Sequence, residues 1–215
     1  MTHLPLPRVD ALIAGLDQAL RTLVRYSPEV ARRPYPAADC PPLALPPPAR
    51  ARAAELMRVN HTGEVCAQAL YLGQATAALT PARRQALQAA AIEEVDHLVW
   101  CARRLRELDA RPSLLNPVWF CGAFSLGALA GLSGERASMG FLAETERQVV
   151  AHLDSHLEQL PFEDKASRQI VIQMRSDEAK HAATARRHGA VELPLPVRWL
   201  MQLQAKVMTT IAARF

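Results

Sequence analysis

Two Glu-x-x-His motifs constrain this chain more than any other feature of its sequence. They are Glu94-Val-Asp-His97 and Glu178-Ala-Lys-His181. A helix places residues i and i+3 on one face, so the two side chains of each motif can point at one spot. Each motif also follows a lone glutamate, Glu64 or Glu146, by about the length of one helical hairpin. The pattern therefore predicts two similar helix pairs whose acidic faces meet.

Such a set of side chains is typical of a site for two metal ions. In a four-helix bundle, one Glu from each of two helices and Glu-x-x-His from each of the others form a carboxylate-bridged di-iron or di-manganese site. Carboxylates and imidazole suit iron, and four carboxylates offset two divalent charges. A solvated helix face is the alternative for a single motif, but two motifs in matching halves favour the metal site. The predicted ligands are Glu64, Glu94, His97, Glu146, Glu178 and His181.

The composition favours one helical protein from a reducing compartment. Of the 215 residues 50% are hydrophobic but only 5% are aromatic, and alanine, leucine and arginine dominate. The four cysteines are scattered without a Cys-x-x-Cys pair, which excludes a disulfide framework and a zinc ribbon. Cys101 is expected to be a small buried apolar residue or, alternatively, a neighbour of the metals.

The net charge of +4 fits an anionic membrane surface as readily as nucleic acid. No nucleic-acid motif and no basic stripe with interleaved aromatic residues is present in the sequence. We therefore expect no nucleic-acid partner. The N-terminus lacks the apolar run of a secretory signal.

Prolines and apolar periodicity divide the chain into two parts. Residues 1–48 are expected to hold a short amphipathic helix over 9–25 and an extended proline-rich linker over 27–48, which wraps or leaves the domain. Residues 49–215 are expected to form the metal-binding domain. Its helices are predicted over 49–79, 80–108, 135–160 and 162–188, followed by a last helix near the C-terminus.

The segment from Ser113 to Gly134 carries no charged residue. Its length would allow a membrane span, but a span would place the two halves of the metal site on opposite sides of the bilayer. We therefore predict an all-α, ferritin-like four-helix bundle in which this segment is a long apolar crossover helix. Its outward apolar side chains predict cover by a partner chain or by the membrane interface.

The extra C-terminal helix repeats this apolar theme. One side of it carries Leu195, Trp199, Leu200, Leu203, Val207 and Ile211. With Arg198, Lys206 and Arg214 elsewhere, it is a basic amphipathic helix that suits a membrane surface. Ordinary packing against the core is the alternative.

Several motifs form a set more specific than the metal ligands alone. They are Arg58-Val-Asn-His-Thr-Gly-Glu64, Tyr71-x-Gly73-Gln74, Glu94-x-x-His97-Leu98, Arg111-Pro112-Ser113, Pro117-x-Trp119, Glu146 with His152, and Asp177-Glu178-x-x-His181. Together they resemble the demethoxyubiquinone hydroxylases of ubiquinone biosynthesis. The resemblance runs from about Ala49 to the C-terminus and leaves the proline-rich residues before it outside. Two departures are Thr62, where relatives often have alanine, and Leu153, where some have tyrosine.

The resemblance implies that residues 49–215 are a ferritin-like di-iron hydroxylase domain. The six ligands would hold two Fe²⁺ ions, with Glu94 and Glu178 bridging them. The domain would hydroxylate a polyprenylated methoxy-methyl-benzoquinol (demethoxyubiquinol), with O₂ as co-substrate. The protein would attach peripherally to the cytoplasmic side of the cell membrane, and a homo-oligomer or a biosynthetic complex remains open.

Further polar residues are candidates for supporting the ligands. Asp177 and Glu93 are the expected carboxylate partners of the ligand histidines, and His152 is expected to join their hydrogen-bond network. For each of them a surface or structural role is the alternative. His61, one turn before Glu64, either faces the site or packs its helix.

The alternative function is a ferritin-like iron-storage or ferroxidase protein. Such a protein keeps a polar exterior, which the charge-free segment 113–134 argues against. A third hypothesis is a lipid-binding scaffold with a vestigial site, which metal analysis would distinguish from an enzyme.

Overall fold

The computed structural model describes residues 31–215, except positions 79 and 188. This part of the chain folds into six α-helices and contains no strand, which confirms the predicted all-α class. The helices are α2 (Pro47–Ala77), α3 (Pro81–Glu107), α4 (Asn116–Leu132), α5 (Glu135–Gln159), α6 (Lys165–Arg187) and α7 (Leu195–Ala212). The helix predicted over residues 9–25 lies outside the described residues.

Prolines and polar caps set the helix ends. α2 begins at Pro47 rather than at Ala49, because proline is accepted in the first helical turn, where its missing N–H has no intrahelical partner. α6 begins at Lys165, later than predicted. The carboxylate of Asp164 precedes it and accepts a hydrogen bond from the backbone N–H of Ser167 at 3.0 Å, as an N-cap does.

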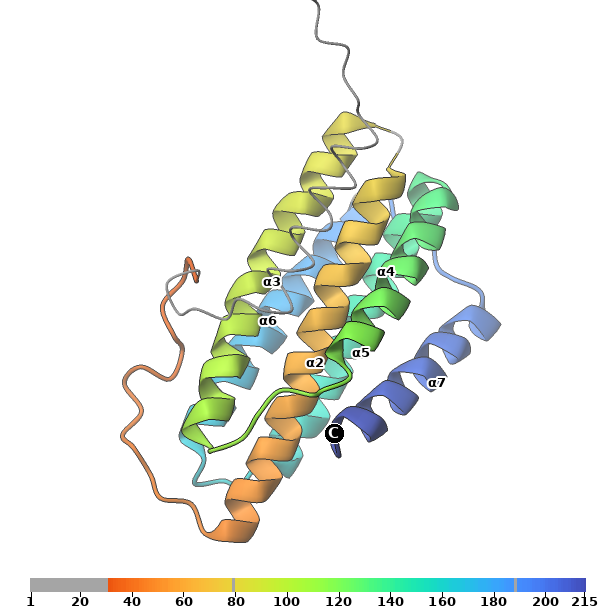
Figure 1. Cartoon of the computed structure of the whole chain (residues 1–215). Helices are drawn as coiled ribbons and strands as arrows, with labels where there is room; N and C mark the ends of the chain where they lie inside the picture. The colour runs from red at the N-terminus through yellow and green to blue at the C-terminus, as the bar shows by residue number, and fades with distance from the viewer. Residues whose placement is uncertain (1–30, 79, 188) are drawn as a thin grey trace, which may run out of the picture.

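Helices α2, α3, α5 and α6 form the four-helix bundle (Figure 1). α2 packs extensively on α3, and α5 on α6, so each predicted helix pair is a neighbouring hairpin. α4 runs beside α2 and joins the end of α3 to the start of α5 at the other end of the bundle. α7 lies outside, against α2 and α5. This is a ferritin-like plan with one extra C-terminal helix, as predicted.

α4 occupies the segment for which a long apolar crossover was predicted. It has 17 residues, against 31 in α2, and its role as a long crossover stays a prediction. α4 approaches α2 so closely that glycine is required at the contact. A Cβ atom on Gly73 would collide with the backbone of Phe124, and one on Gly127 with the carbonyl of Leu70.

The largest apolar core lies among α2, α3, α5 and α6. Its biggest members are Met57, Trp100, Leu105, Leu153, Ile170 and Met174. Full burial of one such side chain stabilises the fold by about 1.5–3 kcal/mol. Cys101 belongs to this core, and its Sγ lies 3.7 Å from the sulfur of Met174. Cys101 therefore packs as a small buried residue, as the first of its two predicted roles requires.

The proline-rich residues 31–46 wrap the bundle along the outside of α3 (Figure 1). The Tyr35 hydroxyl donates a hydrogen bond to Glu107 at 2.9 Å, and the guanidinium of Arg103 lies 3.9 Å from the centre of the Tyr35 ring. Ala37 is buried in the main core. Of the two arrangements predicted for this linker, wrapping rather than leaving the domain is therefore confirmed.

Exposed apolar side chains gather on α4 and α7. They are Val118, Leu129 and Leu132 on α4, and Leu195, Val197, Trp199, Leu200, Leu203 and Val207 on α7. α7 buries only Ala212, while Trp199 is 67% exposed, so the alternative of an ordinary core helix was wrong. No described helix combines the length and apolar character needed to cross a bilayer.

Candidate metal centre

The two Glu-x-x-His motifs and the two lone glutamates meet inside the bundle. α2 carries Glu64, α3 carries Glu94 and His97, α5 carries Glu146, and α6 carries Glu178 and His181. They form two overlapping groups, in each of which one ligand atom per residue lies within 4.8 Å of the others. The structure therefore brings together all six predicted side chains.

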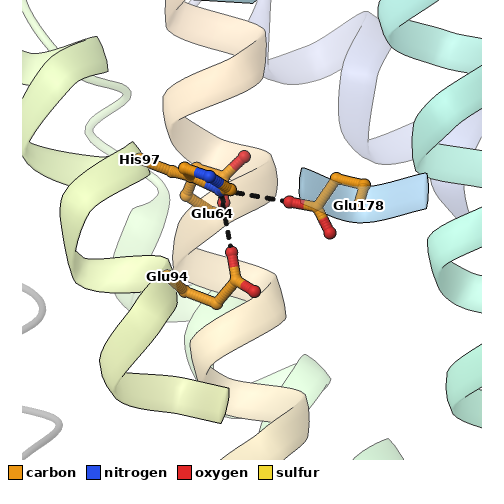
Figure 2. Close-up of side chains that lie close together, drawn as sticks. All are labelled: Glu64, Glu94, His97 and Glu178. Carbon is orange, nitrogen blue, oxygen red and sulfur yellow. Dashed lines mark ion pairs between the residues drawn. The ribbon is translucent and has the colours of Figure 1, made fainter. Parts of the chain in front are cut away.

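The first group, here called the His97 half-site, consists of Glu64, Glu94, His97 and Glu178. Figure 2 shows the three carboxylates around the His97 ring. His97 Nδ1 lies 3.0 Å from Glu94 Oε2, 3.1 Å from Glu178 Oε1 and 3.5 Å from Glu64 Oε2. One ring nitrogen thus faces three buried carboxylates from three helices.

The second group, here called the His181 half-site, consists of Glu146, Glu178 and His181. His181 Nδ1 lies 3.2 Å from Glu94 Oε1 and 3.4 Å from Glu178 Oε2. Glu94 and Glu178 therefore each turn one oxygen toward one histidine and the second oxygen toward the other. The Tyr71 hydroxyl donates a hydrogen bond to Glu146 Oε1 at 2.7 Å, which fixes the orientation of that carboxylate.

The second ring nitrogen of each histidine contacts the acidic residue just before the glutamate of the opposite motif. His97 Nε2 lies 3.2 Å from Asp177, and His181 Nε2 lies 3.0 Å from Glu93. A carboxylate in this position accepts the Nε2–H and leaves the Nδ1 lone pair facing the cluster. The predicted pairing of Asp177 and Glu93 with the histidines is confirmed.

Burial of so many carboxyl groups together changes their proton affinity. Burial raises the pKa of Glu64 to about 8, although the adjacent His97 opposes this shift. Burial and then the negative charge of Glu178 raise the pKa of Glu146 well above 4.5. For His181 burial acts downward, but the neighbouring carboxylates of Glu178 and Glu94 raise its pKa to about 12. The cluster therefore has a strong demand for positive charge.

The donor set fits two divalent cations. Among the described residues, no hydrogen-bond partner reaches Glu64 Oε2, either oxygen of Glu94, or Nδ1 of either histidine. A nitrogen lone pair that faces carboxylate oxygens is repelled unless a proton or a cation lies between them. Four carboxylates carry the charge that two divalent ions cancel, so such a site can be buried. Carboxylate and imidazole ligands accept iron as well as manganese.

A cavity of about 430 Å³ opens between α2, α5 and α7 and reaches the cluster. Glu64, Glu146 and Glu178 are its buried acidic lining. Its apolar lining includes Val59, Ala67, Leu70, Phe141, Val149, Leu153, Met201, Ala205 and Met208. An apolar cleft with a few convergent polar groups can hold an apolar molecule with one reactive part at those groups.

Two histidines outside the cluster have other positions. His152 lines the cavity, and its ring centre lies 3.9 Å from that of His156, while no hydrogen-bond partner reaches its Nε2 among the described residues. The structure thus places His152 on the cavity lining, and its place in the hydrogen-bond network of the clustered histidines stays a prediction. His61 is buried 3.4 Å from Asn116, the first residue of α4, and packs α2 against that helix.

Three residues near the cluster received no role in the sequence analysis: Tyr71, Arg33 and Asp96. Tyr71 belonged to one of the motifs but received no role, although it lies two helical turns after Glu64 and therefore on the same face. Arg33 forms ion pairs with Asp96 at 2.7 Å and with Asp177 at 2.6 Å. No local pattern indicates these pairs, because their partners are far apart in the sequence.

Comparison with known proteins agrees with this site. The family described as "Ubiquinone biosynthesis protein COQ7" matches residues 51–212. The chain belongs to this family. The predicted resemblance is therefore confirmed. As a member of this family, the chain is a hydroxylating oxidoreductase of ubiquinone biosynthesis.

Relatives named "3-demethoxyubiquinol 3-hydroxylase" match nearly the whole chain. The protein from Bordetella parapertussis is 57% identical over 205 residues, which cover 95% of this chain and 91% of the relative. The protein from Dechloromonas aromatica is 53% identical over 96% of this chain and 99% of the relative. The protein from Xanthomonas campestris pv. campestris is 53% identical over 100% of both. The family model begins at residue 51, which agrees with the expected start of the resemblance near Ala49, while the alignments with these relatives also take in residues before Ala49.

Proposed function

We propose that this protein is a di-iron monooxygenase that hydroxylates the ring of demethoxyubiquinol, a polyprenylated methoxy-methyl-benzoquinol, with O₂ as co-substrate. The observation that carries the proposal is a buried cluster of four glutamates and two histidines, three glutamates of which line a largely apolar cavity. The names of the relatives support the choice of substrate.

The proposed iron ligands are Glu64, Glu94, His97, Glu146, Glu178 and His181. Glu94 and Glu178 are the proposed bridging ligands, because each turns its two oxygens toward the two histidines. When bound, two iron ions would supply the electrons that activate O₂. The chain contributes fixed donor positions on four packed helices, and this rigidity keeps the geometry constant through the reaction.

Neighbouring groups hold the proposed ligands in place. Burial and then the charge of Glu146 raise the pKa of Tyr71 well above 10, so its hydroxyl keeps its proton and remains a donor to Glu146. Asp177 and Glu93 hold the imidazole rings of His97 and His181 in the orientation that aims Nδ1 at the cluster.

The cavity provides the substrate site in this proposal. The quinol ring would lie at the end lined by Glu64, Glu146 and Glu178, and the isoprenoid tail along the apolar side chains of α2, α5 and α7. Burial of each CH₂ group is worth about 0.8 kcal/mol relative to water, but the tail is already buried in lipid. The apolar lining therefore gives access to the site and excludes water more than it adds affinity.

Peripheral attachment to the cytoplasmic side of the cell membrane is part of the proposal. α7 is apolar on two sides: Met201, Ala205 and Met208 line the cavity, whereas Trp199 and Leu203 point away from it and are exposed. A helix that is apolar on opposite sides is stable only where both sides meet an apolar environment. Contact of α7 with lipid would satisfy its outer side and bring the cavity next to the membrane.

The experiment that tests the proposed reaction uses the full chain loaded with Fe²⁺ and vesicles that contain demethoxyubiquinol. With ¹⁸O₂ and a chemical reductant, we expect one labelled oxygen atom in the hydroxylated quinol and two irons per chain. Absence of labelled product from the iron-loaded protein would refute the proposal. Uptake of many irons per chain without any product would support the storage alternative instead.

Vesicle flotation tests the membrane contact separately. Leu200→Glu together with Leu203→Glu should release the protein from vesicles, because charge on an exposed apolar face opposes insertion. Gln85→Glu with Gln88→Glu on α3 is the matched control, since it adds the same charge at exposed polar positions. Equal flotation of both double variants would exclude α7 as the contact.

A further inference from the structure

Arg33 joins the segment of residues 31–46 to two helices of the bundle. Its Nε donates to Asp96 on α3 at 2.7 Å, and its Nη1 donates to Asp177 on α6 at 2.6 Å. Both carboxylates are nearly buried, while the Arg33 side chain is partly exposed. One guanidinium thus ties together two helices that carry the two Glu-x-x-His motifs. Hydrogen bonds between such charged groups are among the strongest in proteins.

Two of the groups that Arg33 contacts, Asp177 and Trp100, also touch His97. Asp177 lies against His97 Nε2, and the Trp100 ring lies beside the His97 ring with 5.4 Å between the ring centres. The Arg33 guanidinium stands 4.8 Å from the centre of the Trp100 ring, within the range of a cation–π contact. Arg33 therefore holds the two side chains that set the position of this imidazole.

The segment itself is fixed on both sides of Arg33. The backbone N–H of Arg32 donates to Asp96 at 2.7 Å, and Tyr35 is held by Glu107 and Arg103. The guanidinium is consequently placed by the chain that carries it. It does not have to be captured from a free position, and little conformational entropy is lost when it pairs with the two aspartates.

We propose that Arg33 is a positioning residue for the metal centre: through Asp177 and Trp100 it fixes the ring of His97 for coordination. The inference rests on the proposed di-iron function and adds the segment of residues 31–46 to that site. It also predicts an asymmetry. Glu93, the corresponding partner of His181, is largely exposed and, in the part of the chain that the structure describes, forms no ion pair with Arg33. Loss of Arg33 should therefore weaken binding of the ion at His97 and leave binding of the ion at His181 unchanged.

The test compares Arg33→Met with Arg32→Met in the full chain. Methionine keeps much of the side-chain length and removes the charge in both variants. Arg32 is exposed and bonds Asp96 through its backbone only, so its replacement removes the same charge one residue away without breaking the contact. Arg33→Lys is the conservative variant, since an ammonium restores the charge but does not present two N–H groups in a fixed plane.

The readout is a titration of the metal-free protein with Co²⁺, followed by absorption in the visible range. We expect wild type and Arg32→Met to show the same two binding steps. Arg33→Met should lower the Co²⁺ affinity of one step by about 10-fold, which is the lower end of the loss seen when a group that orients a metal ligand is removed. Arg33→Lys should recover part of this affinity. The Co²⁺ spectrum of the affected step should change, which a general loss of stability would not produce.

Three results would overturn the inference. Equal affinities in Arg33→Met and Arg32→Met would show that Arg33 does not act on the site. Equal weakening of both steps, with an unchanged spectrum and a lower melting temperature of the metal-free protein, would show a role in folding only. If wild type bound no Co²⁺ or Fe²⁺ at all, the proposed metal function would fail as well, and this outcome is distinct from the other two.

Discussion

The His97 and His181 half-sites have the same kinds of ligand but differ in what stands behind each histidine. His97 is 0% exposed, and its Asp177 partner is 8% exposed and paired with Arg33. His181 is 16% exposed, and its Glu93 partner is 63% exposed. One imidazole is therefore held through a nearly buried carboxylate that pairs with an arginine, and the other through a carboxylate that water also reaches.

This difference teaches that a sequence repeat does not give its two copies the same environment. A carboxylate in water exchanges partners and its charge is screened, so it orients a ring weakly. A buried carboxylate held by an arginine cannot turn away without leaving a charge unpaired. We therefore expect the His97 half-site to bind its ion more tightly, and the His181 half-site to exchange its ion faster.

The largest effect should come from Glu178, because this residue faces both half-sites. Glu178→Gln keeps the shape of the side chain but removes its charge and one of its two acceptor oxygens. We expect loss of both ions and a fall of hydroxylation to background. Metal analysis and a product assay measure this, and circular dichroism should show unchanged helix content. Two irons per chain in the variant would exclude Glu178 as a ligand.

The comparison itself is tested by Asp177→Asn against Glu93→Gln. Loss of a carboxylate that orients a ligand histidine lowers metal affinity by roughly 10- to 100-fold. In Asp177→Asn we expect the affinity for the ion at His97 to fall about 100-fold, because nothing replaces the buried carboxylate. In Glu93→Gln we expect the affinity for the ion at His181 to fall about 10-fold, because water replaces Glu93. Stepwise calorimetric titration with Fe²⁺ under argon measures both. Equal losses would show that the half-sites are equivalent.

A substitution that destabilises the fold far from both half-sites should leave the ratio of their metal affinities unchanged. Gly127→Ala places a Cβ atom against the backbone of Leu70, which should cost roughly 1–3 kcal/mol of unfolding free energy. Gly122, on the same helix, has open space around it, so Gly122→Ala should be neutral or stabilise by up to about 1 kcal/mol. Urea unfolding measures the difference. A change in the ratio of the two metal affinities in Gly127→Ala would show that α4 acts on one half-site.

A further effect concerns acid stability. Burial first, and then the charges of His152 and Arg52, lower the pKa of His156 to about 3. The unfolded chain binds this proton near pH 6.5 and the folded chain does not. The unfolding free energy should therefore fall as the pH drops from 6.5 toward 3, by at most about 1.4 kcal/mol per unit from this group.

His156→Gln should remove this part of the pH dependence. Urea unfolding of the metal-free protein at several pH values measures the slope, and the slope that remains in the variant includes the proton uptake of the two half-sites. An unchanged slope would mean that His156 is protonated in the folded protein.

The cluster of six side chains was predictable because its signal is local. Glutamate and histidine three residues apart share one face of any helix, and the lone glutamates Glu64 and Glu146 recur at a similar distance upstream. The support from Glu93 and Asp177 was predictable for the same reason, since each directly precedes a ligand. The role of His152 stays a prediction, because a helix face does not reveal which neighbour it meets.

The sequence by itself determined the all-α class, the helix pairs and the identity of the six clustered side chains, because helical periodicity and proline breaks act over a few residues. The tertiary structure decided the rest. It decided that Arg33 reaches two aspartates 63 and 144 residues away, that α4 lies against α2 at glycines of both helices, and that one half-site is less exposed to water than the other. Such features depend on how the helices pack, and packing distance and solvent access are properties of the assembled chain rather than of any local segment.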